Sequence, residues 1–193
     1  MTQGVGAGAE VAFQLLDGAA AATLGADLHA LHAEVYAEPP YGRRDDAVMF
    51  GERSRVQRRQ PGFVLAAAHR GAYLVGYAAG MRLRPSTSWW GDLTTPLPAD
   101  MTAEYPGRTF ALTDLLVRAS WRRQGIGRAL HELILQNRRE ERATLAVLPA
   151  ATAAQSAFHS WGWSKVARTR AADPASPILD VLVVTLPVAY QPG

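Results

Sequence analysis

A strand, a glycine-containing turn and an amphipathic helix follow one another in the middle of the chain, and a second strand comes after them. The apolar segment 109–117 predicts the first strand, and residues 144–148 predict the second. Between them, apolar residues recur at the spacing of one helix face, at positions 126, 129, 130, 133 and 134. Two strands joined through a helix pair in parallel with a crossover connection. This segment therefore predicts a sheet with at least one parallel pair, covered by a helix.

Further strands and helices are predicted on both sides of this segment. Apolar runs and alternating patterns predict strands at residues 11–16, 63–68, 73–83, 164–169 and 178–186. Helical spacing and terminating prolines predict helices at residues 24–35, from Asp45 and Asp46 to Val56, and at 151–161. The expected fold class is α/β, with a mixed sheet of about seven strands flanked by about four helices.

The predicted elements run along the chain without a repeat or a recognisable linker. We therefore expect a single domain over residues 1–193. Residues 1–9 are small and rich in glycine, which predicts a flexible leader. Residues 84–108 are rich in Pro, Ser, Thr and Trp, and they predict a long loop on the substrate side of the site.

Composition excludes several classes of function. The chain has no cysteine, which rules out disulfides, thiolate metal ligands and a cysteine nucleophile and favours a reducing, cytoplasmic compartment. The formal net charge of +3 is too small to indicate a nucleic-acid partner. No segment approaches the roughly 18 apolar residues of a membrane span. The five histidines are scattered, so no metal site is expected.

The turn between the predicted strand at 109–117 and its helix has the composition of an anion-binding site. Gly125 and Gly127 allow the backbone to approach a ligand, beside the free amides of a helix N-terminus and three arginines, Arg122, Arg123 and Arg128. A Walker loop would continue with Lys and Ser or Thr after Gly127, and a dinucleotide fingerprint would need a third glycine at Leu130. Neither of these common nucleotide sites is therefore expected.

The segment Arg122-Arg-Gln-Gly-Ile-Gly127 resembles the acetyl-CoA pyrophosphate loop of the GNAT superfamily of acyl-CoA-dependent N-acyltransferases. The preceding residues 110–117 are similar to the central strand of that family, and Ala157-Phe-His-Ser-Trp-Gly-Trp163 is similar to its later helix. The resemblance implies a GNAT-like fold, acetyl-CoA as co-substrate and no metal. It also implies direct attack of an amine on the thioester, without a covalent enzyme intermediate.

The resemblance further implies which residues bind the cofactor. The pantetheine arm would pair with backbone of the central strand, and the pyrophosphate would meet the amides of the turn. The implied cofactor-binding residues are Leu115, Leu116, Val117, Arg122, Arg123, Gln124, Gly125, Ile126, Gly127, Arg128 and Phe158. A backbone N–H near Val117 would polarise the thioester carbonyl, because fixed main-chain donors stabilise a developing oxyanion.

Two side chains bear on proton transfer. An alkyl ammonium must lose a proton before attack, and Asp114 is the candidate base, although it could equally be a buried hydrogen-bonding partner. Phe158 occupies the position at which relatives commonly carry a tyrosine that protonates the departing CoA thiolate. Phenylalanine has no proton to donate, so water or another hydroxyl, such as that of a pocket tyrosine, would have to help.

Acceptor contacts are expected by family analogy in two loops. The candidates are Tyr36, Glu38, Tyr41, Trp89 and Trp90, although the tryptophans could equally close a hydrophobic lid or an interface. The expected function is transfer of an acetyl group to a primary amine of a small molecule, with a peptide or protein amine next. The alternatives are a catalytically weak acyl-CoA sensor and, third, an arginine-rich nucleic-acid binder. We expect a monomer or a homodimer.

Overall fold

The computed structural model describes residues 10–42, 47–170 and 176–188. The predicted leader and the predicted helix start at Asp45 and Asp46 lie outside these residues. Seven strands form one mixed sheet in the order β1-β2-β3-β4-β5-β7-β6. Their bounds are β1 Val11–Leu16, β2 Val64–Arg70, β3 Tyr73–Arg82, β4 Thr109–Val117, β5 Arg142–Val147, β6 Ser164–Thr169 and β7 Leu179–Thr185.

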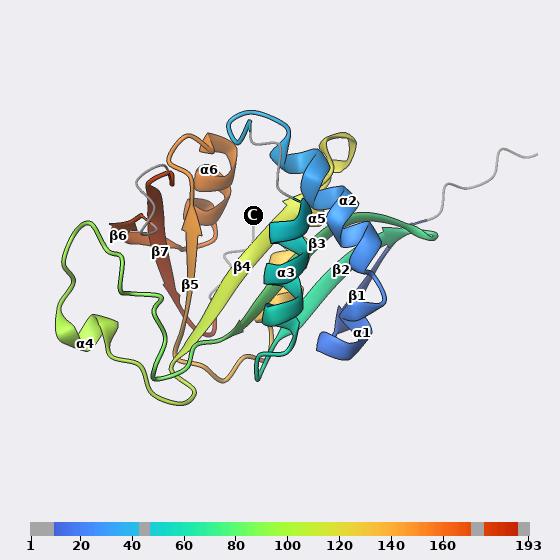
Figure 1. Cartoon of the computed structure of the whole chain (residues 1–193). Coiled ribbons are helices and arrows are strands. Elements are labelled where there is room, and N and C mark those ends of the chain that lie inside the picture. The colour runs from blue at the N-terminus through green and yellow to red at the C-terminus, as the bar shows by residue number, and fades with distance from the viewer. Residues whose placement is uncertain (1–9, 43–46, 171–175, 189–193) are drawn as a thin grey trace, which may run out of the picture.

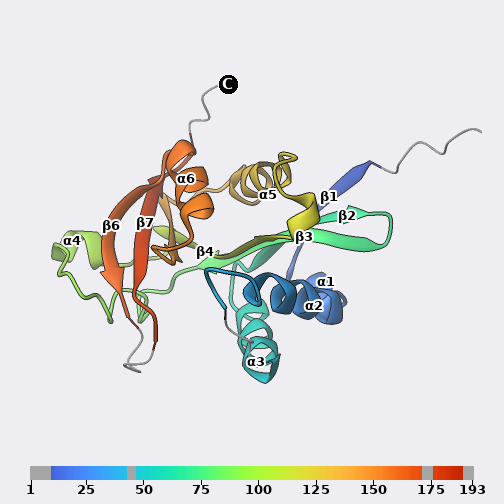
Figure 2. The same cartoon turned by 90° about the horizontal axis from the view of Figure 1, so that it is seen from above.

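Helices cover both faces of the sheet. Their bounds are α1 Gly18–Ala22, α2 Gly25–Tyr36, α3 Ala47–Arg58, α4 Ala99–Thr102, the 3-10 helix η1 Ala119–Trp121, α5 Ile126–Leu135 and α6 Thr152–Ser160. Seen from above, α5 and α6 lie on one side of the sheet, and α1, α2 and α3 lie on the other (Figure 2). No helix among the described residues has the length and apolar character needed to cross a membrane.

Each face of the sheet has its own hydrophobic core. On one face, Leu130 and Ile134 of α5 pack against strand residues such as Phe110, which is fully buried. On the other, Leu28 and Leu31 of α2 pack with residues of β2 and β3. Burial of an apolar side chain of this size stabilises the fold by about 1.5–3 kcal/mol relative to exposure. The helical spacing of these residues is therefore what attaches α2 and α5 to opposite faces.

The predicted α/β fold and the seven strands are confirmed. The strands predicted at 11–16, 109–117 and 164–169 have the observed bounds, and the predicted parallel pair is β4 with β5. Three short helices, α1, α4 and η1, were not predicted. α1 consists of one glycine and four alanines, so it carries no periodic contrast between apolar and polar residues.

The two parallel strands separate along their length. They pair only where residues 109–111 of β4 face residues 142–144 of β5, at the start of each strand. Figure 1 shows the strands side by side at one end and apart at the other. A bulge follows this paired segment, because the register with β3 shifts between Ala79 and Gly80 and leaves Thr113 without a partner opposite. Bulges bend a strand and increase its twist, which accounts for the divergence of β4 from β5.

Candidate active site

A cavity of about 620 Å³ lies where β4 and β5 separate. The C-terminal half of β4, Leu115 to Val117, lines it between two walls. One wall is the end of α2 and the loop after it, with Glu38 and Tyr41, and the other runs along α6 from Thr152 to Phe158. Gly125, Gly127 and the neighbouring arginines form the remaining side. The cavity therefore joins the predicted strand, turn and acceptor loop in one space.

Backbone directions in β4 leave polar groups facing this cavity. The Arg118 N–H donates to the Val75 carbonyl of β3 at 3.0 Å. Successive residues of a strand direct their amides to opposite edges, so the Val117 N–H faces the β5 side, where no strand pairs with it. The Val117 carbonyl accepts a hydrogen bond from the Arg122 Nε at 2.9 Å. The Val117 amide is therefore a main-chain donor aimed into the opening.

The turn after β4 presents unpaired amides at the start of α5. Gly125 has a φ of 80°, a left-handed conformation that favours glycine, and it is the N-cap of the helix. The Ala129 N–H donates to the Gly125 carbonyl, which is the first bond of the helix. The amides of Ile126 and Gly127 precede it and have no partner within α5. These donors lie beside the cavity and suit an anion.

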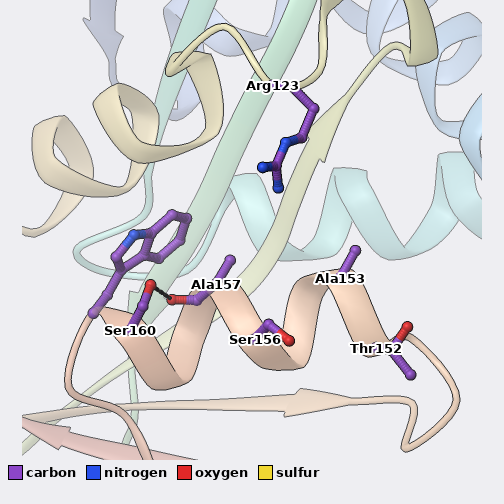
Figure 3. A pocket seen from close by; sticks show the side chains of 7 residues that line it. Arg123, Thr152, Ala153, Ser156, Ala157 and Ser160 are labelled. Carbon is purple, nitrogen blue, oxygen red and sulfur yellow. Dashed lines mark hydrogen bonds between the residues drawn. The ribbon is translucent and has the colours of Figure 1, made fainter.

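The three arginines of the turn differ in their partners. Arg122 is ion-paired with Glu38, in the loop after α2, at 2.7 Å. Arg128 is ion-paired with Glu132 of its own helix at 2.8 Å. Arg123, whose φ is 62°, has no ion pair or hydrogen bond within the described part of the chain. Its guanidinium points towards α6, as Figure 3 shows. Arg123 is thus the cation of this turn that is available to a ligand.

A second cavity of about 540 Å³ adjoins the first at Arg123. Thr152, Ser156 and Ser160 of α6 line it, together with Trp161. Within it, the Ser160 hydroxyl donates to the Ala157 carbonyl at 2.7 Å (Figure 3). Because Arg123 and Thr152 line both cavities, the two form a continuous groove along α6. No pattern in the sequence indicated this second part, since small residues at a helix start are common.

Asp114 faces α2 and α3 and does not line the cavity. Its side chain is 6% exposed and pairs with Arg53 of α3 at 3.6 Å. The same guanidinium donates to His32 Nε2 of α2 at 3.1 Å. Burial lowers the pKa of His32 to about 4 despite the opposing charge of Asp114, so the imidazole is neutral and accepts this bond. Leu116, two residues further along the same face of β4, does reach the cavity.

Phe158 lies in an aromatic cluster behind the α6 wall. It is 6% exposed and makes edge contacts with Trp161 and Trp163, at centroid distances of 5.6 and 5.7 Å. The Trp163 indole donates to His131 Nε2 of α5 at 2.9 Å. Burial lowers the pKa of His131 to about 4, which keeps the imidazole neutral and able to accept this bond. This cluster attaches the end of α6 to α5.

Tyr36, Glu38 and Tyr41 come together at the end of α2 and in the loop after it. The rings of Tyr36 and Tyr41 are 4.7 Å apart, and the Tyr41 N–H donates to the Glu38 carbonyl at 3.0 Å. Burial raises the pKa of Tyr41, while the charge of Arg122 opposes that shift. Of these three residues, Glu38 and Tyr41 line the cavity.

Comparisons with known proteins agree with this geometry. The family model described as "Acetyltransferase (GNAT) family" matches residues 25–163, which is more than half of the chain. The chain belongs to the GNAT acetyltransferase family. It is therefore an acetyltransferase of the acetyl-CoA-dependent kind. A sequence search of curated proteins returns no significant match.

Solved structures of the same fold cover nearly the whole of this acetyltransferase. The yncA protein of Salmonella typhimurium, solved with its cofactor acetyl-CoA, is 13% identical with a TM-score of 0.63, covering 95% of this chain and 98% of its own. The ribosomal-protein-S18-alanine N-acetyltransferase of Escherichia coli is 14% identical with a TM-score of 0.60, and the match covers 95% of this chain and 97% of that one. Aminoglycoside 6'-acetyltransferase type Ii is 17% identical with a TM-score of 0.61, and the match covers 94% of this chain and 99% of that one. At these identities the likeness establishes the fold.

Trp89 and Trp90 of this acetyltransferase lie away from the cavity. They belong to a third hydrophobic cluster with Ala167 and Val181 of the β6–β7 hairpin. The Trp90 indole donates to buried Glu104 at 2.9 Å, and the Trp89 indole donates to Thr144 of β5 at 3.3 Å. The structure does not bring these tryptophans together with Tyr36, Glu38 and Tyr41. Their contacts attach the long loop to the β5–β7 side of the sheet.

Among the described residues, no group of three His, Cys, Asp or Glu side chains could hold a metal ion. The polar groups that line the cavity are instead main-chain amides, three arginines, Glu38, the Tyr41 phenol and the Thr152 hydroxyl. Such a set suits a phosphorylated, thioester-bearing ligand that reacts with an amine.

Proposed function

We propose that this acetyltransferase moves an acetyl group from acetyl-CoA to a primary amine of a small molecule, with a peptide or protein amine as the next candidate. One observation carries the proposal. The opening between β4 and β5 runs directly from an unpaired strand backbone to the unpaired amides at the start of α5. An extended thioester arm and a diphosphate need these two kinds of donor side by side.

Acetyl-CoA is proposed to lie along the groove with its diphosphate at the amides of residues 124–128. Its pantetheine arm follows Leu115, Leu116 and Val117, which line the cavity. The nucleotide end extends into the second cavity, where Arg123 offers an unpaired guanidinium. Each favourable contact of the diphosphate with the helix N-terminus contributes about 0.3–1 kcal/mol to binding, so several such contacts are needed to hold the ligand.

The Val117 amide is proposed to hold the thioester oxygen. When the amine attacks the carbonyl carbon, negative charge develops on that oxygen. A main-chain donor that already points at it needs no reorganisation and favours the transition state. The attack is direct, so no nucleophilic side chain takes part.

Amine deprotonation requires a base, and we propose Asp114 in that role. Its carboxylate is buried on the face of β4 that also bears Leu116, so a proton reaches it through water rather than by direct contact. The Arg53 guanidinium lies beside this carboxylate, at 3.6 Å. Glu38 lines the cavity and is the other carboxylate at hand, but it is paired with Arg122.

A specific observation favours a second candidate function. Phe158 lines the cavity without a proton to donate, which would suit a catalytically weak sensor of acyl-CoA. Isothermal titration with acetyl-CoA followed by free-thiol release against a panel of small amines and peptides separates the two. Turnover on at least one amine supports the acetyltransferase. Tight binding with no turnover on any amine supports the sensor, and absence of binding contradicts both.

A further inference from the structure

The departing CoA thiolate needs a proton that Phe158 cannot supply. Of the cavity-lining side chains, Glu38 is an ion-paired carboxylate, and the three arginines hold their protons too strongly to act as acids. Thr152 lines both cavities, but it carries an alkyl hydroxyl, which is a much weaker acid than a phenol. Among the described residues that line the cavity, this leaves the phenol of Tyr41.

Tyr41 stands on the wall opposite α6. It follows α2 in the chain, whereas Phe158 belongs to α6, and both line the cavity into which Leu115 and Val117 project from β4. Its ring is partly buried and packs against the hydrophobic residues of both faces of the sheet. Contact with the Tyr36 ring and the backbone bond to Glu38 fix its position.

We propose that Tyr41 is the general acid of this acetyltransferase and takes the part that the missing hydroxyl at position 158 would play. This inference rests on the proposed function. The amine nitrogen forms a bond to the carbonyl carbon, and the carbon–sulfur bond breaks. The sulfur takes the phenolic proton of Tyr41. The ammonium gives its first proton through water to Asp114 before the attack, and the second proton, which leaves nitrogen as the tetrahedral intermediate collapses, passes through water to the phenolate. The products are therefore the amide and the free thiol of CoA.

The surroundings of Tyr41 suit this role. Burial raises its pKa, so the phenol is protonated at neutral pH and has a proton to give. The nearby positive charge of Arg122 acts in the other direction and favours the phenolate that forms briefly. The hydroxyl makes no hydrogen bond within the described part of the chain, so it can turn to a ligand sulfur.

The test is Tyr41→Phe, which keeps the ring and removes only the hydroxyl. Removal of a general acid is expected to lower kcat by about 100-fold or more, with the Kd for acetyl-CoA unchanged. The matched control is Tyr73→Phe, because Tyr73 is an exposed tyrosine at the start of β3, outside the cavity. That variant is expected to keep wild-type turnover.

A second variant separates loss of an acid from loss of structure. Tyr41→Phe combined with Phe158→Tyr returns a phenol to the same cavity from α6. We expect the kcat of this double variant to be at least tenfold higher than that of Tyr41→Phe alone. Wild-type turnover in Tyr41→Phe, weaker acetyl-CoA binding in that variant, or no recovery in the double variant would each overturn the inference. A wild-type chain that transfers acetyl to no amine would instead overturn the proposed function, and this inference with it.

Discussion

Replacing Gly125 by Asp places a negative charge at the proposed diphosphate site. A Cβ built at this position meets nothing within 4 Å, so the new side chain does not collide with the protein. The backbone φ of 80° is costly for a residue other than glycine, by about 1–2 kcal/mol of folding free energy. In the Gly125→Asn variant the new side chain is nearly isosteric with Asp and has the same kind of backbone cost. A comparison of the Asp and Asn variants therefore isolates the effect of the charge.

The expected loss of affinity follows from the charge of the diphosphate. At about 5 Å and an effective dielectric constant of about 40, two unit charges repel by about 1.7 kcal/mol. Allowing for two ligand charges and for solvent screening, Asp is expected to weaken acetyl-CoA binding relative to Asn by about 1–3 kcal/mol, or about 5- to 150-fold in Kd.

Isothermal titration of both variants with acetyl-CoA measures this difference. Raising the salt concentration screens exposed charges, so the gap between the two variants is expected to narrow. Thermal unfolding of the unliganded variants checks that each remains folded. Equal Kd values for the Asp and Asn variants would refute the assignment of the diphosphate to this turn.

Three further perturbations have defined outcomes. Asp114→Asn is expected to lower kcat by about 100-fold with unchanged acetyl-CoA affinity, and unaltered turnover across pH would refute its role as base. Glu38→Gln releases Arg122 and is expected to tighten acetyl-CoA binding by up to about fivefold in titration, whereas weaker binding would contradict this. Burial lowers the pKa of His131, and likewise of His32, from 6.5 to about 4, so unfolding favours proton uptake by both. Urea melts should show each histidine lowering stability by about 1.4 kcal/mol per pH unit as pH drops from 6.5 towards 4. His131→Gln should remove about half of this histidine-dependent slope, because His32 still contributes, and an unchanged slope would contradict the assignment.

Local patterns in the sequence were sufficient for the central part of the fold. β4 is a continuous apolar run, and α5 begins where Gly125 allows the left-handed turn, so both could be predicted closely. The resemblance of residues 122–127 to a pyrophosphate loop led to the family that the comparisons establish. These features depend on neighbours in the chain.

Contacts between distant residues could not be predicted in the same way. The divergence of β4 and β5 depends on a bulge opposite β3, and the ion pair of Glu38 with Arg122 joins residues that are 84 positions apart. Likewise, the sequence places Asp114 in a strand but does not indicate its ion pair with Arg53, which depends on how α3 packs on the sheet. The attachment of Trp90 to Glu104 also depends on how the long loop folds. Packing in three dimensions decides each of these.

A crystal structure of the chain with bound acetyl-CoA measures the central claim directly. We expect the two phosphates within hydrogen-bonding distance of the amides of residues 124–128, and the thioester oxygen at the Val117 N–H. Electron density for the cofactor outside the opening between β4 and β5, or a diphosphate remote from the start of α5, would contradict this account.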